Sequence, residues 1–251
     1  MNGREYFPCL STFNIIECPK LVEIPIIPSI TDLIMSRNNA MLIRSVMNLT
    51  SLSSLVIEDM DDELTVLLDG LLQNHKMLEI ENFPEGLQNS HSLRKLYIWE
   101  CNNFLSLTDE CFAPLRGLSS LRILSISSCN RFYSLFEGIQ YLIALEDLYI
   151  EECPKLISLP QGIQHLTSLC SLQISRCEDL SSLPKQIGCL TSLSYLGFSY
   201  CPNLMSIPDE LQNLKALKTL SIEGNPHLEK RCKKDSGEDW NKIFNVLKLK
   251  I

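Results

Sequence analysis

Long apolar runs are absent from this sequence of 251 residues, and glycine is scarce, with only 10 residues. No stretch approaches the roughly 18 uninterrupted apolar residues that a membrane span needs. Residues 1–10 lack a basic start followed by an apolar run, so no export signal is visible. Basic charge is in deficit as well, because 22 Lys and Arg face 30 Asp and Glu, for a formal net charge of −8. This balance argues against a nucleic-acid-binding surface as the main function.

The motifs of common catalytic sites are also missing. There is no Gly-x-x-x-x-Gly-Lys-Ser/Thr phosphate loop, Gly-x-Gly-x-x-Gly, His-Glu-x-x-His or Gly-x-Ser-x-Gly. Adjacent carboxylates at 61–62, 151–152 and 178–179 fit a solvated face better than a general acid–base pair. No Cys-x-x-Cys pair occurs, and the four histidines do not lie at metal-ligand spacing from cysteines. We therefore expect no enzyme activity, no cofactor and no metal.

Cysteine, by contrast, is abundant and regularly spaced. The number of cysteines, 11, is odd, which disfavours a disulfide framework in a chain without a visible export signal. Cys129, Cys153, Cys177 and Cys201 are 24 residues apart, and Asn225 falls on the next step. A fixed period of this size indicates a repeat protein.

Each period carries the same apolar pattern. Leu145-x-x-Leu148-x-Ile150-x-x-Cys153 is typical, and Leu93-x-x-Leu96-x-Ile98-x-x-Cys101 is an earlier copy. This pattern resembles the leucine-rich repeat, whose period is about 20 to 29 residues. We count about ten units, with irregular spacing between residues 38 and 129, where we also place a unit at Leu78-x-Ile80-x-x-Phe83.

The pattern has a direct physical interpretation. Alternating apolar residues point inward from a short strand, and a small Cys or Asn suits the turn that follows within the stack. Pro160, Pro184 and Pro208 start the outer segment, where a missing N–H costs little. Because one unit cannot bury its own apolar face, stacked units share one core.

The prediction is an α/β leucine-rich repeat solenoid, a curved horseshoe with parallel strands on the concave face and short helical convex segments. We predict a repeat domain over 1–228 and a capping tail over 229–251. The predicted internal structural column of turn residues is Cys101, Cys129, Cys153, Cys177, Cys201 and Asn225.

The concave face is the surface with which repeat proteins bind. Its outward residues combine carboxylates with aromatic side chains that nothing within the repeat buries, and exposed aromatics are favoured interface anchors. The candidate protein-binding residues are Tyr97, Trp99, Glu100, Tyr149, Glu151, Glu152, Arg176 and Tyr200. An acidic face with aromatics favours a basic or mixed protein partner.

The end of the chain adds a more specific resemblance. Leu228-Glu-Lys-Arg-Cys232 and Gly237-Glu-Asp-Trp240, with the Cys-Pro-x-Leu repeats at 153–156 and 201–204, resemble plant intracellular disease resistance proteins of the coiled-coil, nucleotide-binding, leucine-rich repeat class. The resemblance implies recognition of a pathogen effector or a guarded host protein, or restraint of a nucleotide-binding switch domain. It also implies a location in the cytoplasm or nucleus. No phosphate loop is present, so no nucleotide site carries over.

Two other interpretations stay open. The chain could be a general intracellular leucine-rich repeat scaffold or adaptor, or a truncated receptor fragment without signalling activity. The tail itself also has a purely structural interpretation, in which Trp240 packs inward, residues 243–247 cover the last strand, and Lys230, Arg231, Lys233 and Lys234 are solvated.

Overall fold

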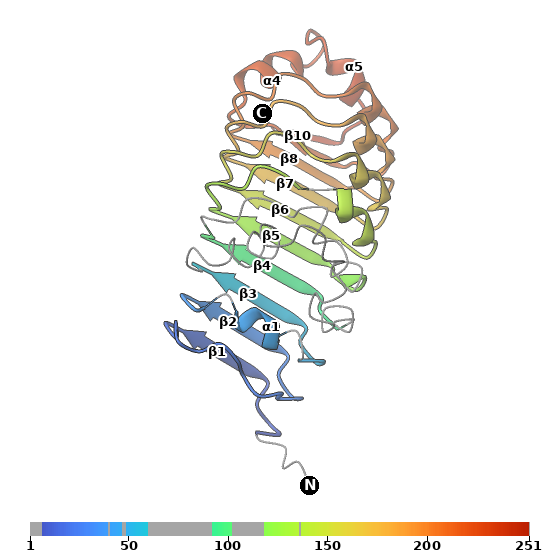
Figure 1. Ribbon diagram of the computed structural model, residues 1–251. Helices are drawn as coiled ribbons and strands as arrows, with labels where there is room; N and C mark the ends of the chain where they lie inside the picture. Colours follow the sequence, from blue (N-terminus) through green and yellow to red (C-terminus); the bar gives the residue numbers. More distant parts are fainter. Residues whose placement is uncertain are drawn as a thin grey trace, which may run out of the picture.

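A single parallel sheet runs through the whole computed structural model (Figure 1). The structure describes residues 7–39, 41–46, 49–59, 92–101, 118–135 and 137–250. Among these residues, ten strands pair in chain order, each parallel to the next. The strands are β1 (Thr12–Ile16), β2 (Asp32–Ser36), β3 (Ser54–Glu58), β4 (Lys95–Trp99), β5 (Ile123–Ser127), β6 (Asp147–Glu151), β7 (Ser171–Ser175), β8 (Tyr195–Ser199), β9 (Thr219–Ser221) and β10 (Lys248–Lys250).

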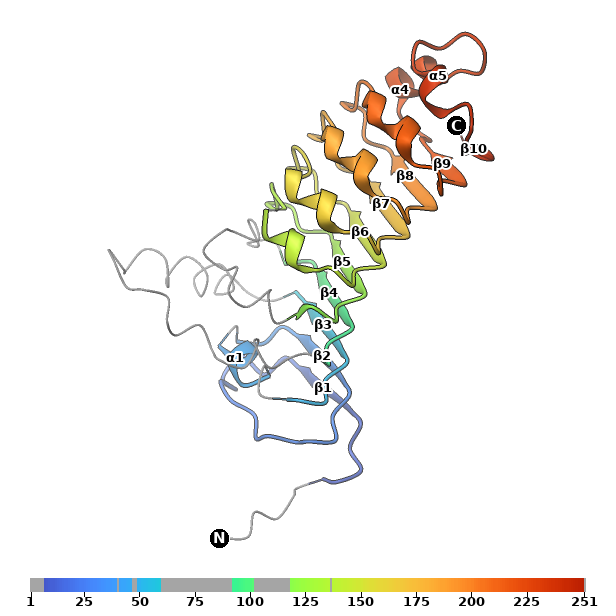
Figure 2. The ribbon, with the colours of Figure 1, turned by 90° about the vertical axis from the view of Figure 1, so that its right-hand side faces the viewer.

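Short helical segments lie on the other side of the stack. They are α1 (Leu42–Val46), the 3-10 helices η4 (Glu137–Tyr141), η5 (Gln161–His165), η6 (Lys185–Cys189) and η7 (Asp209–Asn213), and then α4 (Pro226–Arg231) and α5 (Trp240–Ile243). Pro160, Pro184 and Pro208 each directly precede one of the 3-10 helices. The stack bends so that the strands line its inner side and the helical segments its outer side (Figure 2). The predicted solenoid is therefore confirmed.

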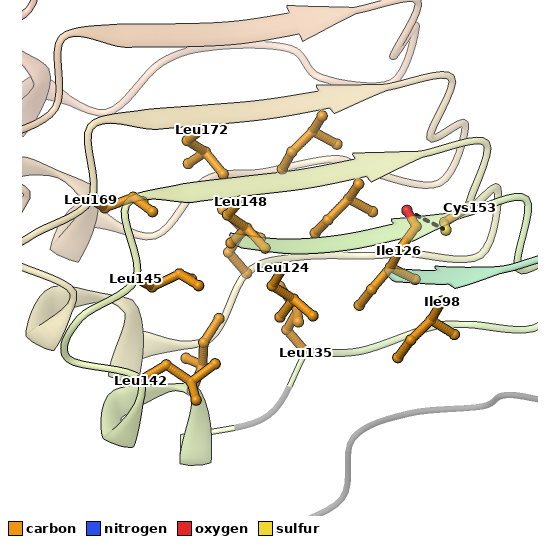
Figure 3. Packing of buried hydrophobic residues seen from close by; sticks show 14 of the residues in the cluster. Ile98, Leu124, Ile126, Leu135, Leu142, Leu145, Leu148, Cys153, Leu169 and Leu172 are labelled. Carbon is orange, nitrogen blue, oxygen red and sulfur yellow. Dashed lines mark hydrogen bonds between the residues drawn. The ribbon is translucent and has the colours of Figure 1, made fainter. Parts of the chain in front are cut away.

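The core follows the two-residue period of the strands. In β6, Leu148 and Ile150 are buried, whereas Asp147, Tyr149 and Glu151 face out. Equivalent Leu and Ile residues from successive units stack into one continuous cluster (Figure 3). Burying a side chain of this size contributes about 1.5 to 3 kcal/mol. Because these contacts join neighbouring units, the stack is stable only as an array.

One predicted unit falls in the irregular region between β3 and β4. Residues 54–58 of β3 pair directly with residues 95–99 of β4. The predicted unit at Leu78-x-Ile80-x-x-Phe83 lies between them in the sequence, outside the described residues, and stays a prediction.

The Cys and Asn residues that follow the strands form an internal column. Cys101, Cys129, Cys153, Cys177 and Cys201 are at most 1% exposed, and Asn225 is fully buried. The thiol of Cys153 donates to the Ile126 carbonyl of the preceding unit at 3.9 Å (Figure 3). The Asn225 amide donates to the equivalent carbonyl of Phe198. A thiol thus makes a weaker version of the amide's contact with the neighbouring unit.

Thiol alkylation should separate this column from the surface cysteines. Cys9, Cys170 and Cys189 are exposed and free, and we expect iodoacetamide to modify them in the native protein. A hydrogen bond to Cys153 together with burial raises the pKa of the Cys129 thiol, and burial raises that of Cys232 to about 12. Since the thiolate is the reactive form, these buried thiols should react only after unfolding. Peptide mass spectrometry after timed alkylation measures this, and equal rates at Cys129 and Cys170 would contradict a buried column.

Candidate protein-binding face

In each five-residue strand the first, third and fifth residues face outward on the concave side. Register aligns them across neighbouring strands, so Tyr97, Ser125 and Tyr149 form one line, and Trp99, Ser127 and Glu151 form the next. None of the candidate binding residues predicted from the sequence belongs to the line of first residues. That line holds Thr12, Asp32, Ser54, Lys95, Ile123, Asp147, Ser171, Tyr195 and Thr219. The two-residue alternation already contained the signal for it.

A further line of side chains follows the strands rather than belonging to them. Its members adopt left-handed backbone angles and are Glu17, Arg37, Asp59, Glu100, Ser128, Glu152, Arg176, Tyr200 and Gly224. Each of the eight non-glycine residues donates its backbone N–H to a carbonyl of the next unit, as Glu152 does to Ser175 at 2.9 Å. For a non-glycine residue this conformation costs on the order of 1 kcal/mol, which the added hydrogen bond and the buried turn offset. Glu100, Glu152, Arg176 and Tyr200 are predicted from the sequence as outward residues of the concave face, and the structure puts them at the turn that follows each strand.

The turn brings its side chains beside the fifth residue of the strand. The Arg176 guanidinium contacts Glu151 at 3.2 Å and Glu152 at 3.0 Å, so these two consecutive carboxylates point to one place. We call the fifth strand residues, their counterpart Glu223 after β9, and the left-handed residues together the strand-end row. The charged members of the row are Glu17, Arg37, Glu58, Asp59, Glu100, Glu151, Glu152, Arg176 and Glu223.

Most carboxylates of the strand-end row already have partners. Arg37 pairs with Glu17 at 2.8 Å and with Asp59 at 2.7 Å, and Ser128 donates to Glu152 at 2.8 Å. The Tyr200 hydroxyl donates to Glu223 at 3.3 Å. Glu58 and Glu100 are the exceptions, since neither forms an ion pair or a side-chain hydrogen bond within the described part of the chain.

The four candidate aromatic residues differ in exposure. Trp99 is 38% exposed and Tyr200 is 50% exposed, whereas Tyr97 and Tyr149 are half-buried. Tyr97 packs edge-to-face against Trp99, with ring centroids 5.7 Å apart. Burial raises the pKa of the Tyr149 hydroxyl, and burial also raises the pKa of the neighbouring Asp147. The exposed aromatic surface is therefore concentrated at Trp99 and Tyr200.

Tyr200 also has a role in packing. Its ring lies over Gly224, where a Cβ atom would come within 2.5 Å of the ring. Gly224 has a φ of +75°, a conformation that favours glycine. The Tyr200 ring therefore packs against Gly224 of the next unit. Substitutions of Tyr200 are expected to change stability as well as partner binding.

The described residues hold no group of three or more His, Cys, Asp or Glu side chains arranged to bind a metal. None of the helices in the described ranges is long and apolar enough to cross a membrane. All ten cysteines that the structure describes are free.

Most of the chain matches one known protein family. The leucine-rich repeat region family matches residues 79–251, more than half of the chain. The chain belongs to this family, whose domains generally act as protein-interaction modules.

Solved structures share the fold at low identity. The leucine-rich repeat domain of the type III effector XopL is 20% identical, with a TM-score of 0.54, over 88% of this chain and 70% of that one. TLR13, in its complex with ssRNA13, is 18% identical, with a TM-score of 0.53, over 78% of this chain and 26% of that one. A chain of the Drosophila Toll–Spatzle complex is 15% identical, with a TM-score of 0.54, over 90% of this chain and 30% of that one. The chain thus spans less than a third of the last two. No curated protein matches the sequence.

Proposed function

We propose that this chain is the protein-recognition region of a plant intracellular immune receptor. In this role its concave face binds a pathogen effector or a guarded host protein, or restrains a nucleotide-binding switch domain. The observation that carries the binding role is the strand-end row, where carboxylates and the exposed rings of Trp99 and Tyr200 lie on one side of the sheet. Aromatic residues surrounded by charge are typical centres of protein interfaces.

The receptor class rests on the resemblance of the tail. The residues that carry the resemblance build the end of the solenoid: Leu228 and Cys232 are fully buried, and Arg231 pairs with the fully buried Asp239. A Cβ atom on Gly237 would meet the Arg231 carbonyl at 2.0 Å. The shared motif is therefore best explained by a common way of ending the repeat stack. The motif supports assignment to that receptor class. The concave face is then the surface that determines which partner binds.

Two experiments test the proposal. The first is to sequence the full-length native transcript, where an in-frame nucleotide-binding domain upstream supports the receptor role. Its absence would reduce the function to that of a leucine-rich repeat scaffold.

The second experiment measures recognition by concave-face variants. Tyr97→Ala, Trp99→Ala and Tyr149→Ala should each weaken partner binding about tenfold, as expected for aromatic interface anchors. Tyr133→Ala is the matched control, because Tyr133 is 44% exposed and lies outside the strands. Recognition would be measured as the defence response or as the dissociation constant for the partner. Equal losses in the control and the three variants would contradict binding by this face.

A further inference from the structure

We propose that Trp99, Glu58 and Glu100 form the seat for a cationic side chain, arginine or lysine, from a basic segment of the partner protein. This inference rests on the proposed function and specifies which chemistry the partner brings to the concave face. Trp99 lies on β4, Glu58 lies directly beside it on β3, and Glu100 follows Trp99 at the turn.

Charged partners are unevenly distributed along the strand-end row. Arg37 and Arg176 satisfy the carboxylates on either side of β3 and β4, at Glu17 and Asp59 and at Glu151 and Glu152. Glu58 and Glu100 alone among the row's carboxylates have neither an ion pair nor a side-chain hydrogen bond within the described residues. The two carboxylates of the row that lack a partner among the described residues thus lie on either side of Trp99.

The side chains next to Trp99 on the neighbouring strand are small. The neighbouring strand β5 presents Ser125 and Ser127 outward, followed by Ser128 at the turn. These small side chains leave the Trp99 ring uncovered on that side, and 38% of the residue is exposed. Tyr97 packs edge-to-face against Trp99 from its own strand and so holds the indole in place.

The chemistry of the three groups suits a cation. An indole ring attracts a cation over its face more strongly than the other aromatic side chains do. Two carboxylates beside that ring add opposite charge, and strand spacing of about 4.8 Å puts Glu58 and Trp99 within reach of one side chain. The closest basic group on the same strand is Lys95, at the opposite end, about 13 Å along the strand at 3.3 Å per residue. It therefore cannot fill the seat.

The test uses a defined probe and the full 251-residue chain. The probe is a fluorescein-labelled peptide of alternating glycine and arginine, and its matched control carries citrulline, the neutral isostere, in place of arginine. Binding is measured by fluorescence anisotropy, and the seat is located by the NMR signal of the Trp99 indole N–H. The only other tryptophan is Trp240, so Trp240→Phe assigns the signal.

The expected result is saturable binding of the arginine peptide, with a shift of the Trp99 indole signal, and no such shift with the citrulline peptide. Trp99→Ala should weaken binding about tenfold and the double variant Glu58→Gln/Glu100→Gln about fivefold. The charge-matched control is Glu178→Gln/Asp235→Asn, which removes two exposed carboxylates away from Trp99 and should leave binding within about twofold. Thermal unfolding confirms that each variant is folded.

Several results would overturn the seat. Equal binding of the arginine and citrulline peptides, an unchanged Trp99 signal, or equal losses in the two double variants would each do so. Recognition of a protein by the concave face would then still stand on the Tyr149→Ala result. Conversely, the proposed function is refuted if all three aromatic variants still recognise the partner as well as the parent does. That outcome does not depend on how the arginine peptide binds.

Discussion

Replacement of Asp239 by alanine is expected to destabilise the C-terminal end of the solenoid by about 3 kcal/mol. Asp239 is fully buried and accepts hydrogen bonds from Arg231 at 2.8 and 3.0 Å. Lys242, only 16% exposed, also pairs with it at 2.8 Å. Lys242 in turn donates to the Ile207 carbonyl and pairs with Asp209, which ties the tail to η7. Removing the carboxylate leaves two cations without their shared partner.

Glu238 provides the matched control for this prediction. It also pairs with Arg231, but its side chain is 75% exposed. Glu238→Ala should therefore cost less than about 1 kcal/mol. Urea unfolding followed by circular dichroism measures both variants. Similar free energies of unfolding for Asp239→Ala and Glu238→Ala would show that the buried pair does not hold the tail.

Acid should weaken the same contact. Burial alone would raise the pKa of Asp239, but the hydrogen bonds from Arg231 and Lys242 outweigh it and lower that pKa. The folded state therefore releases this proton more readily than the unfolded chain, whose aspartate pKa is about 3.9. Its contribution is complete above that value and is lost as the pH falls through the lower folded pKa. The Asp239→Asn variant should lose less stability than the parent between pH 7 and pH 3.

Replacement of Asn225 by alanine should cost about 3 kcal/mol, because it leaves several buried backbone groups without partners. The Asn225 side chain accepts from the Cys201 N–H at 2.6 Å and donates to the carbonyls of Phe198 and Ile222 at 2.5 and 2.9 Å. These bonds join two units and the start of α4. Asn225→Cys should cost less than Asn225→Ala, since cysteine occupies the equivalent position in the preceding units.

Asn203→Ala is the control for this series. The Asn203 amide makes one exposed bond to the Glu178 carbonyl at 2.8 Å, also across neighbouring units. Its loss should cost about 0.5 kcal/mol. Chemical denaturation gives the order of stabilities, and the interpretation fails should Asn225→Ala unfold at the same urea concentration as Asn203→Ala.

We propose that residues 229–251 cap the repeat domain, although by a different arrangement from the one the sequence suggests. Residues 248–250 form β10, which pairs with β9, so the backbone itself covers the edge of the last strand. Phe244 and Leu247 are consequently 59% and 83% exposed, contrary to the expected apolar cover. Trp240 packs against the core as expected, whereas Arg231 is engaged with Asp239 rather than simply solvated.

The amino-acid pattern alone specifies the repeat and hence the fold. Leu-x-x-Leu-x-Ile at a period of 24 residues has one stable arrangement, because each unit must bury its apolar side against the next. The same alternation determined which side chains of β4 to β9 face the concave side. The unit that the pattern predicts at residues 78–83 lies outside the described residues.

How charges and rings meet depends on packing across the stack in three dimensions. Glu58 and Trp99 are 41 positions apart in the sequence, and the parallel register of β3 and β4 makes them neighbours. The left-handed turns are not visible in the sequence either, because eight of the nine residues that adopt them after the strands are not glycine. Asp239 looks like a solvated residue in a charged tail, and it is buried because Arg231 and Lys242 converge on it. Such contacts depend on distances across the stack, which a local pattern does not encode.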